Sequence, residues 1–329
     1  WAEPETSTLV ERARAAEEAA LAVTGVTNSE GAEAGWGLTR IALAATNGFM
    51  GAYARSSHSV SVSALAGTGT GMERDYDYSS TVHGAELDDP VSVGRRAGER
   101  AVRRLNPRKT ATARMPVVID QRLAGGLVRN LAGAINGSSI ARGTSFLKDK
   151  MGERIFPVGI NIVDDALKPR GLASKPFDAE GLASGRTLFV EDGVLTSWVL
   201  DLYSARKLGL DSTGHASRGI GGPPSPSTTN LYLEAGTVSV AEMIGDIAEG
   251  LYVTEMIGSG VNGLTGDYSR GAAGFWIERG EITYPVSEIT VAGNLKDMFL
   301  ALTAADDLEF KGAVNAPTLR IEGMTVAGR

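Results

Sequence analysis

The chain has 329 residues, of which 32 are Lys or Arg and 39 are Asp or Glu, so its formal net charge is −7. That balance argues against a surface that follows nucleic-acid phosphates, because such binding depends mostly on Lys and Arg. The absence of cysteine excludes disulfides, thiolate metal ligands and a cysteine nucleophile. No apolar run approaches the roughly 20 residues of a membrane-spanning helix. We therefore expect a cytoplasmic protein that binds neither nucleic acid nor a membrane.

The first part of the chain predicts a helix followed by β structure. Apolar residues recur at helical spacing from Thr6 to Val23. Short β-type runs follow between Thr39 and Ala66, with the hairpin signal Asn47-Gly48 between them. Small polar and apolar residues alternate from Ser59 to Leu65, so we expect one face to meet solvent or another chain. Gly67 to Gly71 interrupts the sheet, and because no Lys-Ser or Lys-Thr follows, it is not interpreted as a phosphate-binding loop.

A second helix is predicted from Val91 to Leu105, because the preceding Asp88-Asp89-Pro90 is a typical N-terminal capping sequence. Five arginines on this helix resemble a nucleic-acid patch: Arg95, Arg96, Arg100, Arg103 and Arg104. Glu99 lies among them, and we interpret the run as a solvated helix face. We place a domain boundary within residues 107–114, between an N-terminal α/β domain (1–113) and a C-terminal domain (114–329).

The second domain predicts a mixture of strands and helices. A buried-type strand runs from Met115 to Asp120, and a helix with one apolar stripe follows from Gln121 to Ile135. Further strands are predicted within 186–200 and 272–291 and at 319–322, and further helices at 202–208, 238–248 and 295–304. Strands and helices do not alternate strictly, so we expect an α+β fold with mixed and antiparallel sheets.

Residues that could carry chemistry are few. His58, His83 and His215 are far apart in sequence, and none has a second histidine within a helical turn, so they predict no metal site. Ser204 and Lys207 match an S-x-x-K pattern, but its companion motifs are absent and we interpret the match as chance. Two glycine-flanked loops remain candidate substrate-binding sites, with loop packing as the alternative. Their candidate residues are Thr213, His215 and Arg218 in the first loop, and Asn262, Thr265, Asp267 and Ser269 in the second.

Both loops belong to a series of motifs that a known family shares. The series includes, in order, Gly143 to Leu147 (GTSFL), Phe177 to Gly181 (FDAEG), Ser212 to Ala216 (STGHA), Asn262 to Ser269 (NGLTGDYS) and Gly274 to Glu278 (GFWIE). In these motifs the chain resembles the TldD/PmbA family, and within it the PmbA (TldE) branch. The resemblance implies a large β-rich C-terminal domain and, since full-length members begin further upstream, residues before Trp1.

The resemblance also implies a function. Members of the family form a cytosolic bacterial metalloprotease in which a TldD subunit pairs with a TldE/PmbA subunit, and its targets are unfolded peptides such as an antibiotic precursor or an antitoxin. The family's older description as a modulator of DNA gyrase comes from genetics. The acidic charge balance favours treating that link as indirect.

The catalytic branch of the family carries an H-E-x-x-x-H motif on the helix before the Thr-Ser region, and a later cysteine. Two registers remain open for the three motif positions: Asp120, Gln121 and Gly125, or Val128, Arg129 and Gly133. Neither set supplies a general base and three metal ligands, because Gln and Arg are not bases and Gly and Val have no ligand atom. We therefore expect a non-catalytic subunit without a cofactor of its own, with zinc in a TldD-like partner.

A second interpretation belongs to a different class of function. The two glycine-flanked loops could bind a peptide or a small ligand in a stand-alone homodimer that has no protease activity. Co-purification with a TldD homologue would favour the subunit model. A homodimer in which the loops face each other would favour the binding protein.

Overall fold

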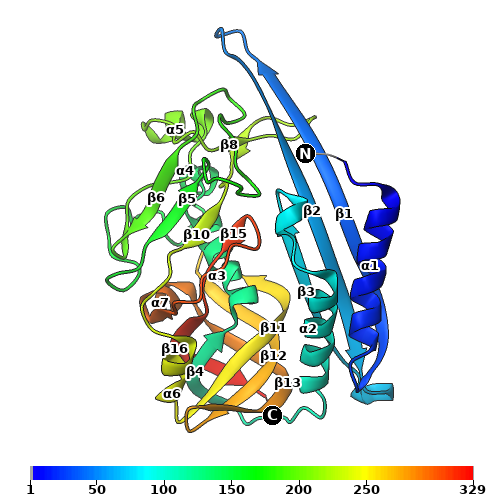
Figure 1. The fold of residues 1–329 in the computed structure, drawn as a ribbon. Coiled ribbons are helices and arrows are strands. Elements are labelled where there is room, and N and C mark those ends of the chain that lie inside the picture. The colour runs from blue at the N-terminus through cyan, green and yellow to red at the C-terminus, as the bar shows by residue number, and fades with distance from the viewer. Residues whose placement is uncertain (1–2, 329) are drawn as a thin grey trace. The chain divides into compact units, whose positions relative to one another are not determined.

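The structure, a computed structural model, describes residues 3–328 (Figure 1). The chain divides into two compact units, which we describe separately. Unit 1 consists of the residues up to Ile41, together with Ala52–Arg108 and Arg170–Leu172. Unit 2 contains Ala42–Gly51, Lys109–Pro169 and the remainder from Ala173.

Unit 1 is a three-stranded sheet with two helices. The sheet has the order β1-β2-β3, and its strands are β1 (Val26–Ala44), β2 (Met50–Ala66) and β3 (Glu73–Thr81). Helices α1 (Thr6–Leu21) and α2 (Pro90–Arg103) lie side by side, and alternate residues of β2, such as Val60 and Val62, are buried with them in one core. The two helices approach closely at Gly94, where a Cβ would lie 2.0 Å from the Ala16 carbonyl oxygen.

The arginines of α2 pair with the acidic residues of β3, which corrects our interpretation of a solvated helix face. Arg96 and Arg100 both contact the buried carboxylate of Asp77, Arg100 at 2.7 Å. Arg104 is 6% exposed and lies 3.5 Å from Glu73 and 3.7 Å from Asp75. The sequence could not show this, because the acids lie about twenty or more residues earlier on another element. Arg95 and Arg103 are exposed, as expected.

Unit 2 is built around a five-stranded barrel. Its strands are β4 (Ala113–Ile119), β11 (Glu249–Val261), β12 (Asp267–Glu278), β13 (Glu281–Asn294) and β16 (Leu319–Ala327). They follow the order β13-β12-β11-β4-β16, and pairing of β13 with β16 closes the barrel. Strand β14 (Leu302–Ala304) adds to β16, and only the β4–β11 pair in this sheet is parallel.

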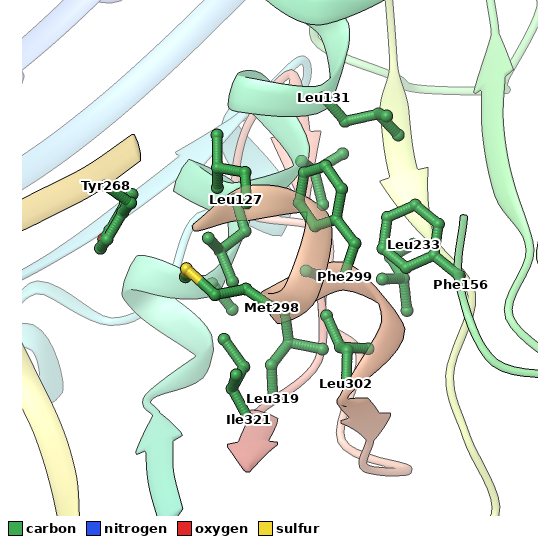
Figure 2. Packing of buried hydrophobic residues seen from close by; sticks show 14 of the residues in the cluster. Leu127, Leu131, Phe156, Leu233, Tyr268, Met298, Phe299, Leu302, Leu319 and Ile321 are labelled. Carbon is green, nitrogen blue, oxygen red and sulfur yellow. The ribbon is translucent and has the colours of Figure 1, made fainter. Parts of the chain in front are cut away.

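Helices α3 (Gln121–Ala134) and α7 (Leu295–Leu300) contribute to the main core of unit 2. Leu127 and Leu131 of α3 are buried in the same cluster as Met298 and Phe299 of α7 (Figure 2). Phe156 stacks on Phe299 with ring centroids 4.7 Å apart. Helix α6 (Val240–Gly245) belongs to a smaller cluster with Val118 and Ile277.

A second sheet of unit 2 has the order β15-β10-β5-β6-β7. Its strands are short: β5 (Ile162–Asp165), β6 (Arg186–Glu191), β7 (Val194–Leu195), β10 (Leu231–Leu233) and β15 (Val314–Asn315). The helices α4 (Gly137–Ala141) and α5 (Leu202–Leu208) and the paired two-residue strands β8 (Ala216–Ser217) and β9 (Ser225–Pro226) complete this unit. The predicted α+β fold with mixed and antiparallel sheets is confirmed.

Several predicted elements have different bounds in the structure. The β run expected from Thr39 is the end of a 19-residue strand, β1, and β11 was not predicted at all. The helix expected at 295–304 ends at Leu300, because residues 302–304 pair with β16 as strand β14. The helix expected at 238–248 is limited to Val240–Gly245, and the strand expected at 319–322 continues to Ala327.

Candidate functional site

The start of α3 is where the first register places the degenerate metal motif. Asp120 caps this helix, since its Oδ1 accepts a hydrogen bond from the Arg122 backbone N–H at 3.0 Å. The same oxygen pairs with Arg122 Nε at 3.1 Å, and Oδ2 accepts from the Tyr252 hydroxyl at 3.0 Å. Both oxygens of this carboxylate are therefore engaged, and a guanidinium offsets its charge.

Tyr252 comes from β11, and its hydroxyl donates to Asp120. Burial, and then the charge of Asp120, raise its pKa well above the usual value of 10.0. The charge of Asp307 acts in the same direction, whereas Arg122 opposes it. The hydroxyl therefore stays protonated at neutral pH and serves as a hydrogen-bond donor to Asp120.

The other two positions of this register are also committed to packing. Gln121 donates its side-chain amide to the backbone carbonyl of Asp307. A Cβ on Gly125 would lie 2.9 Å from the carbonyl oxygen of Val314, which is too close for any side chain unless the backbone moves. Asp307 is occupied as well, since Thr318 donates its backbone N–H and its hydroxyl to the two carboxylate oxygens at 2.7 Å.

The second register gives no better set of ligands. Val128 is buried in the core of unit 2, whereas Arg129 and Gly133 are exposed on α3. Across residues 3–328, no three His, Cys, Asp or Glu side chains gather in a way that could hold a metal ion. In both registers, the side chains present do not fit a zinc ion, which needs three or four free N, S or O ligands that converge.

His215, in the first candidate loop, belongs to a buried polar network. It is 2% exposed, its Nδ1 lies 2.7 Å from the Thr213 carbonyl oxygen, and its Nε2 lies 3.1 Å from Asp164 Oδ2. Asp164 also accepts from the Thr229 backbone N–H at 2.7 Å and from the Thr229 hydroxyl at 2.5 Å. Because a carbonyl oxygen only accepts, Nδ1 is the donor in its contact with Thr213, and Nε2 lies within hydrogen-bond distance of Asp164. The network ties the loop to β5.

Within the first loop, Thr213 and Arg218 have different surroundings. The Thr213 hydroxyl accepts from the Leu200 backbone N–H at 2.9 Å and contacts the imidazole Nδ1 of His215 at the same distance. Arg218 follows strand β8 and is exposed. Of the three residues predicted here, Arg218 is therefore the one whose side chain solvent reaches freely.

The second candidate loop is the turn between β11 and β12. Asn262 accepts from the Leu264 backbone N–H at 2.9 Å, and the Thr265 hydroxyl donates to Asp267 at 2.6 Å. The Asn294 side-chain amide also donates to Asp267, at 3.1 Å. The bond from Thr265, and then the bond from Asn294, hold the pKa of Asp267 below its usual range. Ser269 is exposed on β12. Each loop gathers its own predicted residues, and none of the hydrogen bonds of residues 3–328 described above joins the two loops.

Comparison with known proteins identifies the family. The PmbA/TldA metallopeptidase C-terminal domain matches residues 112–328, and the central domain of the same family matches residues 1–105. The chain belongs to the PmbA/TldD family. The resemblance inferred from the motifs is thus confirmed.

The chain is 41% identical to the metalloprotease PmbA of Escherichia coli O157:H7 over 97% of its length and 70% of the relative. It is 36% identical to a metalloprotease PmbA homologue of Haemophilus influenzae, and covers 61% of that relative. A structure described as a modulator of DNA gyrase, from Bacteroides thetaiotaomicron, aligns with a TM-score of 0.90 at 28% identity, over 99% of this chain and 72% of that one. TldE of Thermococcus kodakarensis, at 22% identity, covers 99% of this chain and 75% of its own, and shares the fold with a TM-score of 0.88.

Sequence reasoning missed the partners of the motif positions. Tyr252 lies 132 residues after Asp120, on the strand that was not predicted, and Asp307 lies 186 residues after Gln121. No local pattern connects such residues, since only the parallel pairing of β4 with β11 brings Tyr252 beside the start of α3.

Among the helices of residues 3–328, none combines the length and apolarity that crossing a membrane requires.

Proposed function

We propose that this chain is the non-catalytic, PmbA/TldE-type subunit of a cytoplasmic two-subunit metalloprotease that degrades unfolded peptides. In this proposal a TldD-like partner supplies the zinc ion and the general base. The relatives that match most of the chain are named metalloprotease PmbA. That name describes those proteins. For this chain we propose a structural role in the assembly and no part in metal-dependent catalysis.

The observation that carries the proposal is the start of α3. A metalloprotease of this type needs a metal ion and a general base on one helix to activate water. Here Asp120 is held by Arg122 and Tyr252, and Gln121 is held by a backbone carbonyl. Gly125 has no room for a ligand side chain. Each position is thus adapted to packing, which supports a structural role for this helix.

The two glycine-flanked loops are the proposed contribution of this chain to substrate binding. Arg218 and Ser269 are exposed, and Asn262, Thr265 and Asp267 are exposed in the turn between β11 and β12. Thr213 and His215 would hold the first loop in place through their hydrogen-bond network with Asp164. Polar side chains of this kind can bond the backbone of an extended peptide without selecting its sequence.

Reconstitution tests the proposal directly. The chain, a TldD homologue from the same organism, and an equimolar mixture are each incubated with zinc and an unfolded peptide, and cleavage is followed by mass spectrometry. We expect cleavage only in the mixture, and its loss on adding a chelator. Chelator-sensitive cleavage by this chain alone would overturn the proposal. A stable homodimer that binds the peptide and ignores the TldD homologue would support the stand-alone binding protein instead.

A further inference from the structure

The chain has three Asn-Gly sequences, which are the dipeptides most prone to lose the asparagine amide. They begin at Asn47, Asn136 and Asn262. In this reaction the backbone nitrogen of the glycine attacks the side-chain carbonyl carbon of the asparagine, and glycine has no Cβ to obstruct the approach. In a folded protein the reaction therefore depends on whether that nitrogen is free. The structure holds the three pairs differently.

At Asn136 both reacting groups are held in hydrogen bonds. The Gly137 backbone N–H donates to the Val199 carbonyl at 2.8 Å, and Gly137 is buried. The amide nitrogen that would leave, Asn136 Nδ2, donates to the Pro226 carbonyl at 2.9 Å. A reaction at this pair would have to break both bonds in a buried part of unit 2. We therefore expect Asn136 to stay intact.

Asn47 is exposed in the turn between β1 and β2, but its glycine is also engaged. The Gly48 backbone N–H donates to the Ala45 carbonyl at 3.0 Å. The Asn47 Oδ1 accepts a hydrogen bond from the Phe49 backbone N–H at 3.0 Å. The bond from Gly48 to Ala45 must break before the Gly48 nitrogen can attack. That requirement slows the reaction without preventing it.

At Asn262 the attacking nitrogen is free. Asn262 and Gly263 are exposed in the turn between β11 and β12, and within residues 3–328 the Gly263 N–H has no hydrogen-bond partner. The Asn262 Oδ1 accepts from the Leu264 backbone N–H at 2.9 Å and from the Thr265 backbone N–H at 3.4 Å. Negative charge develops on this oxygen during the attack, and backbone N–H groups directed at it stabilise that charge. The turn thus favours the reaction at this pair.

We propose that the fold selects Asn262, among the three pairs, as the site of spontaneous deamidation. A bond forms between Gly263 N and Asn262 Cγ, the Cγ–Nδ2 bond breaks, and the nitrogen leaves as ammonia with the proton of the Gly263 N–H. Water then opens the succinimide. Opening at Cγ gives aspartate, and opening at the main-chain carbonyl carbon gives isoaspartate. Water is the only co-reactant, and the site does not depend on the proposed protease role.

The two products have different effects on the turn. Both add a negative charge near Asp267, whose carbonyl accepts from the Asn262 N–H at 2.8 Å. Only isoaspartate lengthens the backbone between residues 262 and 263, because its chain runs through Cβ and Cγ. The Gly263 carbonyl accepts from the Phe146 N–H at 3.0 Å, and Phe146 packs against the main core of unit 2. A longer backbone displaces that carbonyl, so isoaspartate frees the Phe146 amide.

Peptide mapping of aged protein tests the proposal. The folded chain and the chain in urea are incubated in neutral buffer and digested at acidic pH, and aspartate and isoaspartate at each pair are quantified by mass spectrometry. In urea we expect similar rates at all three pairs. In the folded chain Asn262 should convert about three- to tenfold faster than Asn47, where a hydrogen bond must break first, and Asn136 should not convert. An Asn262 rate no higher than that of Asn47 or Asn136 in the folded chain would overturn the proposal.

Gly263→Ala is a matched control, because a Cβ on Gly263 would have nothing within 4 Å. We expect this variant to fold and to keep Asn262 intact, since the Cβ obstructs the attack. Asn262→Asp adds the charge without the longer backbone. Hydrogen exchange of the Phe146 amide should become faster in aged wild type and stay slow in both variants. Conversion of Gly263→Ala at the wild-type rate would refute attack by the Gly263 nitrogen, and unchanged exchange in wild type that carries isoaspartate would refute the displaced turn.

Discussion

Gly125 and Gly126 are adjacent residues of α3 in opposite surroundings, and they test why this helix cannot hold a ligand. A Cβ on Gly125 would lie 2.9 Å from the Val314 carbonyl oxygen, whereas a Cβ on Gly126 would have nothing within 4 Å. Alanine improves helix propensity at either position by up to about 1 kcal/mol. At Gly125 this gain is opposed by overpacking against backbone, which costs about 1–3 kcal/mol.

We expect Gly126→Ala to raise the free energy of unfolding by roughly 0.5–1 kcal/mol and Gly125→Ala to lower it by about 1 kcal/mol. Urea unfolding followed by circular dichroism measures both variants under the same conditions. The neighbouring glycine is the control, because it lies on the same helix and undergoes the same change. Equal stabilisation of both variants would show that the Val314 carbonyl leaves room for a side chain at residue 125.

The same contact predicts the outcome of restoring the motif. The triple variant Asp120→His, Gln121→Glu, Gly125→His places the family's metal-binding residue types at the first register. It also removes the cap of α3, which costs about 1 kcal/mol, and overpacks Val314. We expect a destabilised chain without stoichiometric zinc by elemental analysis. A stable triple variant that binds one zinc ion would show that the start of α3 retains the geometry of a metal site.

Further predictions concern unit 2. Tyr252→Phe should cost about 1 kcal/mol, by loss of one hydrogen bond to Asp120. Folding raises the pKa of Tyr252 above 10.0, so its contribution to the free energy of unfolding is complete below pH 10 and is lost as the pH rises further. The free energy of unfolding should therefore fall less above pH 10 in the variant than in the wild type. The same pH dependence in both proteins would contradict this. Phe49→Ala should lower the thermal midpoint because its ring packs on Phe177 at 5.0 Å, whereas Met50→Ala, at an 83% exposed residue, should not; equal midpoints would refute the contact. Asp164→Asn should cost about 3 kcal/mol in urea unfolding, because it disrupts the buried hydrogen bonds that Asp164 makes with His215 and Thr229, and a loss below about 1 kcal/mol would show that this network contributes little to stability.

Elements with strong local signals were predictable from the sequence. The apolar stripe located α3, and the strands predicted within 186–200 correspond to β6 and β7. Strand β1 was predicted only at its end, because residues 28–37 are rich in Gly, Ala and Glu, which have low β propensity. Pairing with β2 orders that segment, and tertiary contacts of this kind leave no local pattern.

The candidate site was predictable in its residue types but not in its contacts. From the residue types in both registers, the sequence predicts no catalytic metal site at Asp120, Gln121 and Gly125 or at Val128, Arg129 and Gly133. It could not show that Tyr252 bonds Asp120, because the two residues meet only through the pairing of β4 with β11. Similarly, His215 stood out as a polar residue between glycines, whereas its burial against Asp164 depends on the second sheet of unit 2.

The zinc content of each subunit decides whether this chain is catalytic or only a partner of the catalytic subunit. The active assembly of this chain with a TldD homologue is separated into its subunits under native conditions, and the zinc bound to each is measured by mass spectrometry. We expect zinc only in the TldD homologue, with this chain at background even after incubation with excess zinc. Stoichiometric zinc held by this chain, together with chelator-sensitive peptide cleavage in the absence of the partner, would contradict it.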